Sequence, residues 1–158
     1  MSLVRLRLSI LLPLALAAHS GCKPMSNPPE PKSWAMTDYA WSNRPLLVFA
    51  SDTDDASLAE QRRLLDADPA GLAERHIVVL QAIGDAVTAD GEPVNAAPAD
   101  LRRQYNVDPD APFTALLIGK DTGVKLRSDE PIALDRLFGV IDAMPMRRSE
   151  MREQARTD

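Results

Sequence analysis

The residues best suited to chemistry in this 158-residue chain are Asp52, Asp54 and Asp55, which directly follow the apolar run PLLVFA at residues 45–50. Such a run is typical of a strand buried on both faces. Carboxylates at a strand end supply the oxygen ligands that Ca²⁺ and Mg²⁺ prefer. The same residue type also caps helices by accepting hydrogen bonds from free backbone amides. Because the spacing lacks the glycine and the final glutamate of an EF-hand loop, we expect helix capping here and no metal site.

The Asp52-Thr53-Asp54 spacing resembles the Asp-x-Asp motif of haloacid-dehalogenase-type phosphatases. That resemblance implies a first aspartate that attacks phosphorus and a second that handles the leaving-group proton beside Mg²⁺. The chemistry also needs an acid and a lysine from another strand end, which Lys120 and Asp121 would supply. A metal-assisted hydrolase built on this acidic strand end is therefore an alternative hypothesis.

The side chains that commonly perform redox and metal chemistry are scarce. The chain has one cysteine, Cys22, and two histidines, His19 and His76. A single cysteine excludes an internal disulfide, a CxxC pair and a multi-cysteine metal site. His76 stands alone before a predicted strand, where we expect a surface residue. We assign no catalytic residue, no metal and no cofactor.

The charge of the chain disfavours nucleic acid as a partner. The formal net charge is −5, and residues 34–144 alone carry 19 acidic and 10 basic side chains, which gives −9. Sequence-independent binding to nucleic acid needs a basic face that neutralises phosphates. We expect an unknown protein or peptide partner, and no nucleic acid.

The first 21 residues have the pattern of a secretory signal peptide. Arg5 and Arg7 precede an apolar stretch at residues 8–18, which is too short to span a membrane as a helix. Cys22 follows Ser20-Gly21 and resembles the lipidated cysteine of bacterial lipoproteins, although His19 departs from the usual aliphatic residue. Ordinary cleavage near residues 15–17, which would leave a free thiol, is the alternative.

The rest of the chain divides into a spacer, a domain and a tail. Residues 22–33 hold the cysteine and a spacer with four prolines, and residues 34–146 form the predicted domain. Residues 147–158 are a polar tail, which we expect to be either a solvated extension of the last helix or a frayed end. We expect localisation in the bacterial cell envelope, as an outer-membrane lipoprotein facing the periplasm, with the N-terminal lipid as its membrane contact.

Strands and helices alternate along the predicted domain. Apolar runs predict strands at residues 45–50, 77–83 and 113–118, and the short turn at Asp121-Thr122-Gly123 predicts an antiparallel fourth strand at residues 124–127. Asp90-Gly91 is typical of a hairpin turn, here in a protruding loop that runs to Pro98. Capping residues and three-and-four apolar spacing predict helices at residues 56–67, 99–105 and from Pro131 to Pro145, with a short turn of helix at Asp68-Pro69.

This βαβαββα order is that of an α/β, single thioredoxin-like domain without the CxxC motif. Tyr105-Asn106-Val107, a proline-bearing loop and FTALLIGKDTG resemble the Tyr-Gly-Ile, cis-proline and strand–turn stretch of thioredoxins. LLVFA, LLIGKD, KLRS and DAMPMRR resemble a family of unknown function of small secreted bacterial proteins. That family looks like a peroxiredoxin relative and is related to an extracellular domain of animal sushi-repeat matrix proteins. The resemblance covers about residues 34–152.

The thioredoxin resemblance locates the place where thiol chemistry would occur. Reactive cysteines of that fold lie after the first strand, at a helix N-terminus that lowers the thiol pKa. Here this place holds residues 51–57, and Ser57 is the nearest counterpart of the peroxiredoxin cysteine. A serine hydroxyl cannot replace a peroxide-reducing thiolate.

We therefore favour a redox-inactive binding module held at the envelope, which would dock its partner on this strand end. The candidate binding residues are Asp52, Asp54, Asp55, Ser57, Arg147 and Arg148. The two arginines lie beside Met144 and Met146, where they would form a second docking surface or complement the dipole of the last helix. The alternatives are an enzyme that uses the acidic strand end, including a peroxiredoxin derivative, and a purely structural envelope lipoprotein.

Overall fold

The computed structural model describes residues 32–33 and 35–156, which belong to one compact unit. The predicted signal peptide, Cys22 and most of the predicted spacer lie outside the described residues. None of the helices in the described part of the chain combines the length and the apolar character that crossing a membrane requires.

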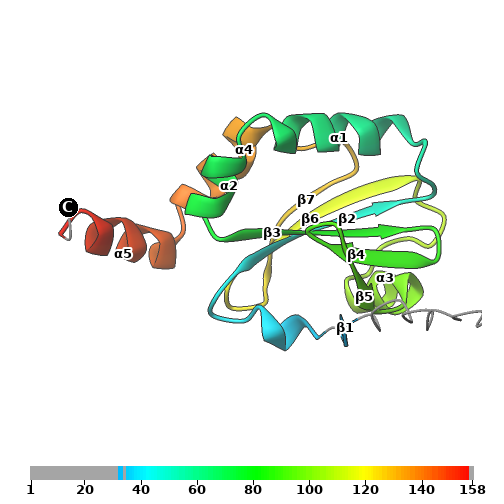
Figure 1. The fold of residues 1–158 in the computed structure, drawn as a ribbon, viewed down its shortest axis with the longest axis horizontal. Coiled ribbons are helices and arrows are strands. Elements are labelled where there is room, and N and C mark those ends of the chain that lie inside the picture. The colour runs from blue at the N-terminus through cyan, green and yellow to red at the C-terminus, as the bar shows by residue number, and fades with distance from the viewer. Residues whose placement is uncertain (1–31, 34, 157–158) are drawn as a thin grey trace, which may run out of the picture. The chain divides into compact units, whose positions relative to one another are not determined.

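A mixed sheet forms the centre of this unit (Figure 1), and its strands lie side by side in the order β1-β5-β4-β3-β2-β6-β7. The central strand β2 runs parallel to β3 and antiparallel to β6. Strands β4 and β5 continue antiparallel beyond β3, and β7 pairs with β6 at the opposite edge. The strands are β1 (Lys32–Ser33), β2 (Arg44–Ala50), β3 (Ile77–Ile83), β4 (Ala86–Ala89), β5 (Glu92–Asn95), β6 (Phe113–Ile118) and β7 (Val124–Ser128).

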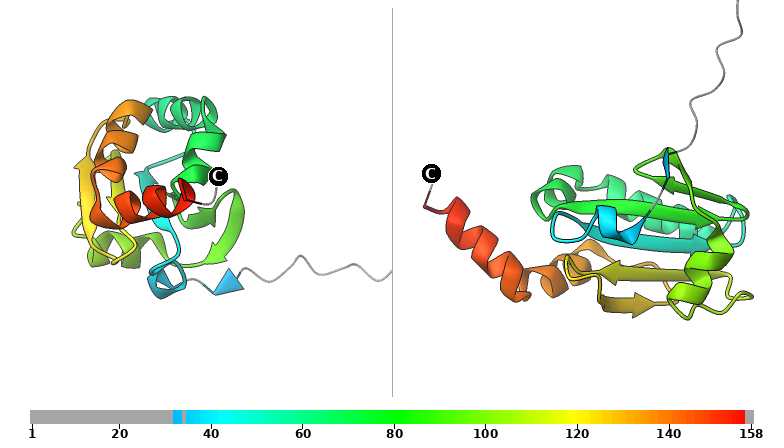
Figure 2. Two further views of the ribbon diagram at one scale, coloured as in Figure 1. Left: turned by 90° about the vertical axis from the view of Figure 1, so that its left-hand side faces the viewer. Right: turned by 90° about the horizontal axis from the view of Figure 1, so that it is seen from below.

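Helices cover both faces of the sheet (Figure 1). The helices α1, α2 and α4 lie on one face, and α3 and the 3-10 helix η1 pack on the other. The helix α5 continues from α4 past the end of the sheet (Figure 2). The helices are η1 (Met36–Asp38), α1 (Ala56–Asp66), α2 (Pro69–Glu74), α3 (Pro98–Gln104), α4 (Leu134–Asp142) and α5 (Pro145–Gln154).

Two apolar clusters hold the layers together, because the central strands are buried on both faces. Side chains of β2 alternate between them: Leu46 and Val48 pack under α1 and α4, whereas Leu47 and Phe49 pack toward α3. The continuous apolar runs in the sequence therefore have the burial that such runs predict.

The predicted α/β fold class is confirmed, and most predicted elements lie within three residues of their observed positions. The correction concerns residues 86–95, where a loop was expected. The chain there forms the hairpin of β4 and β5, with Asp90-Gly91 at its turn and both residues at positive φ. These strands lack an apolar run because they lie near the edge of the sheet, so the burial pattern that reveals a strand is missing.

The polar C-terminal segment is helical, which was one of the two expectations for it, but the helix is not solvated throughout, because Arg147 is buried. The boundary expected between residues 146 and 147 falls inside α5, which begins at Pro145. Among the described residues no peptide bond is cis, so Pro112 departs from the cis-proline of the thioredoxin resemblance.

Candidate functional site

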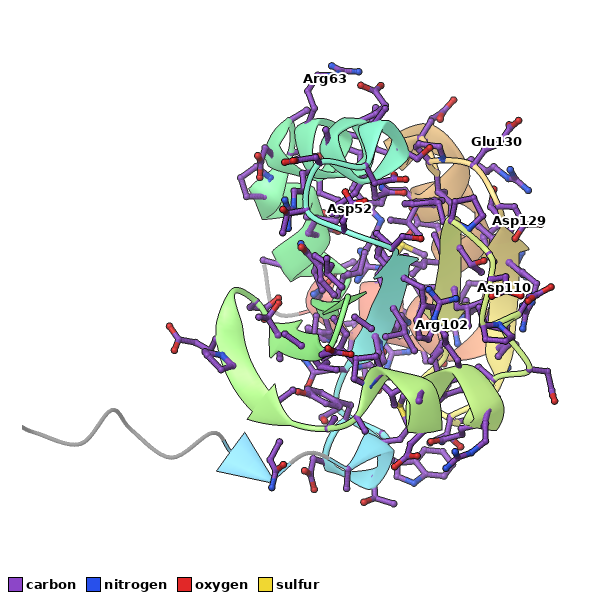
Figure 3. The ribbon with its side chains drawn as sticks, turned by 90° about the vertical axis from the view of Figure 1, so that its right-hand side faces the viewer. Asp52, Arg63, Arg102, Asp110, Asp129 and Glu130 are labelled. Carbon is purple, nitrogen blue, oxygen red and sulfur yellow. The ribbon has the colours of Figure 1, made fainter. Side chains whose placement is uncertain are left out.

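The carboxyl ends of β2 and β3 lie at the same end of the sheet as the start of β6 and the end of β7. We call this end the strand-end face and define it by residues 51–55, 84–85, 106–112 and 128–130. Figure 3 looks onto this end of the sheet and labels Asp52, Asp110, Asp129 and Glu130 there. Its exposed acidic residues are Asp52, Asp54, Asp85, Asp108, Asp110, Asp129 and Glu130.

Of the aspartates after β2, Asp55 has the predicted capping role. Asp55 is the N-cap of α1, and its Oδ1 accepts a hydrogen bond of 2.8 Å from the backbone nitrogen of Leu58. Asp52 Oδ1 accepts 2.8 Å from the nitrogen of Asp54 and thereby closes the turn. Thioredoxin-like proteins place a reactive thiol at this helix N-terminus. Here the Asp55 carboxylate already accepts a hydrogen bond from one of the free backbone amides.

The strand-end segments are joined through backbone contacts. The nitrogen of Ser51 donates 3.1 Å to the carbonyl of Pro112, and the nitrogen of Gly84 donates 3.4 Å to the carbonyl of Ala50. Ser57 lies half-buried in the first turn of α1. The sequence-predicted residues Asp52, Asp54, Asp55 and Ser57 are therefore all brought to one end of the sheet.

Two arginines at this end, Arg102 and Arg127, bond to backbone carbonyls of the protein. Arg102 Nη1 donates 2.7 Å to the carbonyl of Asp108 and 3.4 Å to that of Ala111, and its guanidinium lies 5.1 Å above the ring of Phe49. Arg127 donates to the carbonyls of Tyr105 and Asn106. These bonds hold the 106–112 loop in place. The exposed charge of the strand-end face is therefore predominantly negative.

Two open grooves flank the 106–112 loop. The larger, of about 690 Å³, runs from the β3–β4 turn at Asp85 along the start of α3 to Val107. The smaller, of about 420 Å³, lies between Asp108 and the end of β7 at Arg127 and Asp129. Grooves of this size beside exposed carboxylates suit an extended chain segment better than a small enclosed substrate.

The phosphatase arrangement is wrong, and the reason is strand direction. Because β6 runs antiparallel to β2, Phe113 pairs with Ala50 while Leu117 pairs with Leu46. Lys120 and Asp121 follow β6 and therefore lie at the opposite end of the sheet from Asp52. Among the described residues no cluster of three or more histidine, cysteine and acidic side chains is placed to hold a metal ion.

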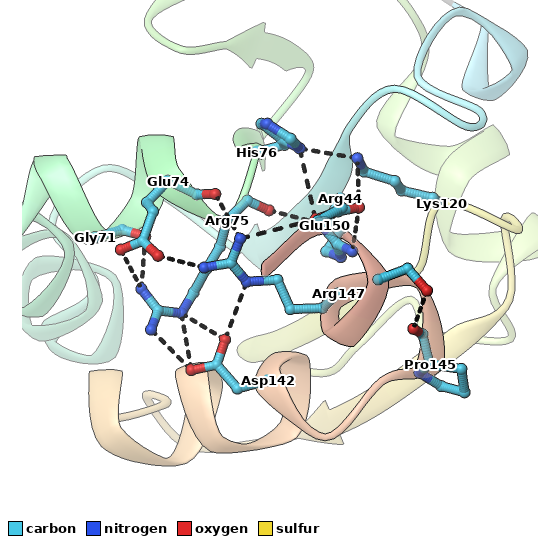
Figure 4. Close-up of polar contacts among 11 residues, drawn as sticks. Arg44, Gly71, Glu74, Arg75, His76, Lys120, Asp142, Pro145, Arg147 and Glu150 are labelled. Carbon is cyan, nitrogen blue, oxygen red and sulfur yellow. Dashed lines mark hydrogen bonds and ion pairs between the residues drawn. The ribbon is translucent and has the colours of Figure 1, made fainter. Parts of the chain in front are cut away.

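The opposite end of the sheet holds a network of buried charges that the sequence analysis did not anticipate (Figure 4). Arg44 is 1% exposed and makes two hydrogen bonds to Glu150, of 3.0 and 3.2 Å. Lys120 is also buried, and its Nζ lies 2.8 Å from Glu150 Oε1 and 2.8 Å from His76 Nδ1. Glu150 thus pairs with two cations at once, Arg44 at the start of β2 and Lys120 just after the end of β6.

Arg147 belongs to this network, which corrects its expected role as an exposed docking residue. Its side chain is fully buried and contacts the carboxylates of Glu74 and Asp142. Its buried side chain is therefore not available to dock a partner. Its neighbour Arg148 is exposed, as a docking residue must be.

Burial and charge shift the pKa values of the titratable groups in the network. Burial opposes ionisation of Glu150, but hydrogen bonds from Arg44 and Lys120 outweigh it and hold the pKa of this carboxyl below 4.5. For Asp142, Arg75 and Arg147 likewise outweigh burial and lower the pKa. Burial, together with the charge of Lys120, lowers the pKa of His76 below 6.5. The network therefore favours neutral His76 and ionised carboxylates.

One sequence signal for this network exists. Arg44 stands immediately before the apolar run of β2, and an arginine at the start of a fully buried strand needs a partner carboxylate. The identity of that partner has no local signal, because Glu150 lies 106 positions away in an otherwise polar segment.

Comparison with known proteins gives a family and a fold. Residues 35–150 match the family described as "Domain of unknown function (DUF4174)". Coiled-coil domain-containing protein 80 of Danio rerio is 25% identical over 134 residues, and the alignment covers 73% of this chain. The chain spans only 15% of the length of that relative.

Two solved peroxiredoxins share the fold. The reduced 2-Cys peroxiredoxin of Plasmodium vivax gives a TM-score of 0.54 at 16% identity, over 72% of each chain. Plasmodium yoelii Prx1a gives a TM-score of 0.52 at 16% identity, over 72% of this chain and 79% of that one. These similarities confirm the thioredoxin-like fold. A secreted bacterial origin and the relation to sushi-repeat proteins stay predictions.

Proposed function

This chain belongs to the DUF4174 family and has a thioredoxin-like fold, and from that premise we propose that it is a redox-inactive binding module whose strand-end face docks a basic protein or peptide segment. The observation that carries the proposal is that an aspartate caps the N-terminus of α1. The Asp55 carboxylate, bonded to the nitrogen of Leu58, stands where the fold otherwise presents a thiol.

Charge and shape support a basic partner. The acidic side chains of the strand-end face are exposed, while Arg102 and Arg127 are bonded to backbone carbonyls of the same face. A lysine- or arginine-bearing segment would meet Asp108 and Asp129 in the smaller groove and Asp85 in the larger groove, whose wall also contains Arg102 and Arg103. Electrostatic attraction of this kind raises the association rate and weakens with salt.

The test uses variants that change charge without removing a cap. Asp55 is left intact because it caps α1, and the carboxylates of Asp52, Asp54 and Asp110 are changed together to amides. The charge-matched control is Asp66→Asn, Glu92→Gln and Asp135→Asn, all at exposed positions outside the strand-end face. Circular dichroism and urea denaturation establish that both triple variants remain folded.

The probes are fluorescently labelled 12-residue peptides, one set rich in lysine and arginine and one set of equal length rich in glutamate. We expect anisotropy to show binding of basic peptides only, weakened by 0.5 M salt. The strand-end triple variant should bind at least tenfold more weakly, and the control should bind as the wild type does. Equal weakening by both variants, or no binding of any basic peptide, would show that the face has no docking role.

We also propose that the domain is exported and anchored by a lipid on Cys22, with residues 23–33 as a spacer that holds it away from an outer membrane. The support is the sequence pattern of residues 1–22. Intact mass spectrometry of the chain purified from bacterial membranes tests this directly. A mass equal to that of a chain that starts at Cys22 and carries lipid on it supports the anchor. A soluble chain whose Cys22 thiol is unmodified excludes it.

A further inference from the structure

The C-terminal helix α5 is attached to the rest of the domain by charge. Among the residues that the structure describes, none from Pro145 to Gln154 belongs to either apolar cluster of the core. The fully buried side chain of this helix is that of Arg147, a cation. Apolar burial stabilises by about 25 cal/mol per Å² whatever the pH, but α5 contributes little of it. The attachment of α5 therefore depends on ionised side chains.

Glu150 is the acidic contact of this attachment (Figure 4). Its carboxylate lies 3.0 Å from Arg44 at the start of β2 and 2.8 Å from Lys120 after β6. His76, before β3, and Arg147, on α5 itself, each have a nitrogen 3.9 Å from it. One carboxylate of α5 thus faces three permanent cations and one histidine.

Arg147 is the basic contact of the attachment. Its guanidinium pairs with Glu74 at the end of α2 and lies 3.3 Å from Asp142 at the end of α4. Arg75 contacts the same two carboxylates, at 3.4 Å and 2.7 Å respectively. Together with the contacts of Glu150, these pairs join three carboxylates to four permanent cations, so positive charge is already in excess.

A short link allows α5 to move as a unit. Ala143 and Met144 separate it from α4, and Met144 has an extended backbone with ψ at 141°. Leu137 and Ile141 hold α4 in the core, so rotation about Met144 displaces α5 and leaves α4 in place. The helix α5 has 10 residues, and a helix of this length is marginal by itself in water. Once detached, α5 therefore also loses its helical structure.

We infer that α5 is an acid-released latch, which leaves the end of the sheet and unfolds when Glu150 and Asp142 take up protons, while the sheet and the other helices stay folded. Loss of these two negative charges leaves four cations facing one carboxylate, that of Glu74, so repulsion replaces attraction. The two clusters of the core are held by apolar contacts, which acid leaves intact.

The carboxyl groups determine the pH range of release. Burial opposes ionisation of Glu150 and Asp142, but hydrogen bonds from their cationic partners outweigh it and lower their pKa values from 4.5 and 3.8 in the docked state. Detached carboxyl groups have ordinary pKa values, so they take up protons more readily than docked ones. Docking is therefore at full strength above about pH 5 and weakens as the pH falls through the docked pKa values.

His76 acts in the same direction. Burial, together with the charge of Lys120, lowers the pKa of His76 from 6.5. Protonation of His76 adds a positive charge beside Lys120, whose Nζ lies 2.8 Å from His76 Nδ1. The histidine and the carboxyl groups therefore all weaken the docking of α5 as the pH falls.

Release changes the surface at this end of the sheet. Arg44 and Lys120, which α5 covers at neutral pH, become accessible together with their positive charge. The domain therefore presents a cationic end only in acid. The inference does not depend on the proposed function of the strand-end face, because the two surfaces lie at opposite ends of the sheet.

Nuclear magnetic resonance of the ¹⁵N-labelled protein between pH 7 and pH 3 tests the latch. We expect the amide signals of residues 147–154 to reach the positions of an unfolded chain about 0.5 pH unit or more above the pH at which the signals of β2, β3 and β6 lose their dispersion. Loss of all these signals at one pH, or a helix α5 that persists until the sheet unfolds, would overturn the inference.

Glu150→Gln should open the latch at pH 7, because it removes the charge without acid. Trypsin should then cut after Arg148 and Arg152 at least tenfold faster than in the wild type, while the sheet keeps its dispersed signals. Glu130→Gln makes the same change at an exposed position of the strand-end face and should leave the cleavage rate unchanged. A Glu150→Gln helix as resistant to trypsin as that of the wild type would contradict the latch.

Glu74→Gln is a milder variant that decides the question even where Glu150→Gln does not fold. The Glu74 side chain is 52% exposed and pairs with Arg147, so its neutralisation weakens docking without leaving a buried group unpaired. The pH of release should rise by about 0.5 unit. Glu92→Gln, at an exposed position away from the network, should leave it unchanged. Equal pH values of release for the wild type and Glu74→Gln would overturn the inference.

Discussion

Arg44, the first residue of β2, and Glu150, in the middle of α5, form a two-pronged ion pair across 106 positions of the chain. Arg44 Nη1 lies 3.2 Å from Glu150 Oε2, and Nη2 lies 3.0 Å from Oε1. Such a bidentate pair, with two parallel hydrogen bonds from a guanidinium to a carboxylate, is among the stronger polar contacts in proteins. The polar C-terminal helix is therefore attached to the start of the central strand by charge more than by apolar contact.

Glu150→Gln should destabilise the domain by about 3 kcal/mol, because it leaves the buried Arg44 and Lys120 without their carboxylate. Urea denaturation at pH 7, followed by circular dichroism, measures this loss. Glu130→Gln makes the same chemical change at an exposed position of the strand-end face and should cost less than about 0.5 kcal/mol. Equal effects of the two variants would contradict the structural role of the pair.

Ending the chain after Met146 should destabilise the domain more than Glu150→Gln does. This truncation follows the boundary that the sequence pattern suggests, yet it removes Glu150 together with the buried Arg147. Arg44 and Lys120 lose their partner, and Glu74 and Asp142 lose a cation. Ending the chain after Gln154 instead retains these contacts and should leave the urea midpoint unchanged. A stable, fully folded chain ending at Met146 would refute this account.

The comparison of sequence and structure shows which signals identify a strand or helix in this chain. The runs of β2, β3 and β6 are predictable because burial on one or both faces of the sheet imposes apolar side chains. Helices α1 and α2 are predictable from local caps at Asp55 and Asp68. The strands β4 and β5 carry neither signal, since they lie toward the edge of the sheet, and only the turn between them at Asp90-Gly91 is visible in the sequence.

The same distinction between local and long-range signals applies to the site residues. The cap at Asp55 is local, so the sequence predicts it, whereas the distance between Asp52 and Lys120 depends on the direction of β6. The position of Arg147 depends on how α5 folds back against Glu74, a contact 73 residues away. Composition identifies the segment from residue 147 onward as polar, but polarity alone does not distinguish a solvated tail from a helix attached by ion pairs.

Two helical glycines should respond in opposite ways to alanine. At Gly71 a Cβ would lie 2.2 Å from Asp68 Oδ2 and 2.9 Å from Phe138 Cε2, and Asp68 cannot move away without losing its cap contact with the nitrogen of Gly71. Gly71→Ala should therefore cost about 2 kcal/mol. At Gly139, on α4, a Cβ meets nothing within 4 Å, so Gly139→Ala should stabilise by about 0.5–1 kcal/mol. Thermal unfolding of the two variants and the wild type gives both signs in one experiment, and a shift of the same sign for both would contradict the packing described at α2.

The stability of the domain should fall in two stages as the pH decreases from 7. Because the pKa of His76 is lowered from 6.5, the unfolded chain takes up a proton first, and stability declines once the pH falls below about 6.5. The pKa values of Glu150 and Asp142 are lowered from 4.5 and 3.8 in the folded state, so their contribution is complete above about pH 5 and is lost as the pH falls through the folded values.

His76→Asn separates the two stages. Residue 76 has a φ of 52°, a backbone conformation that asparagine tolerates well, and an asparagine Oδ1 is able to accept a hydrogen bond from Lys120. The urea midpoint of this variant should stay level between pH 7 and 5, while the wild type declines. Below pH 5 both proteins should lose stability together, because Glu150 and Asp142 are unchanged. A variant that still declines between pH 6.5 and 5 would show that the first stage does not arise from His76.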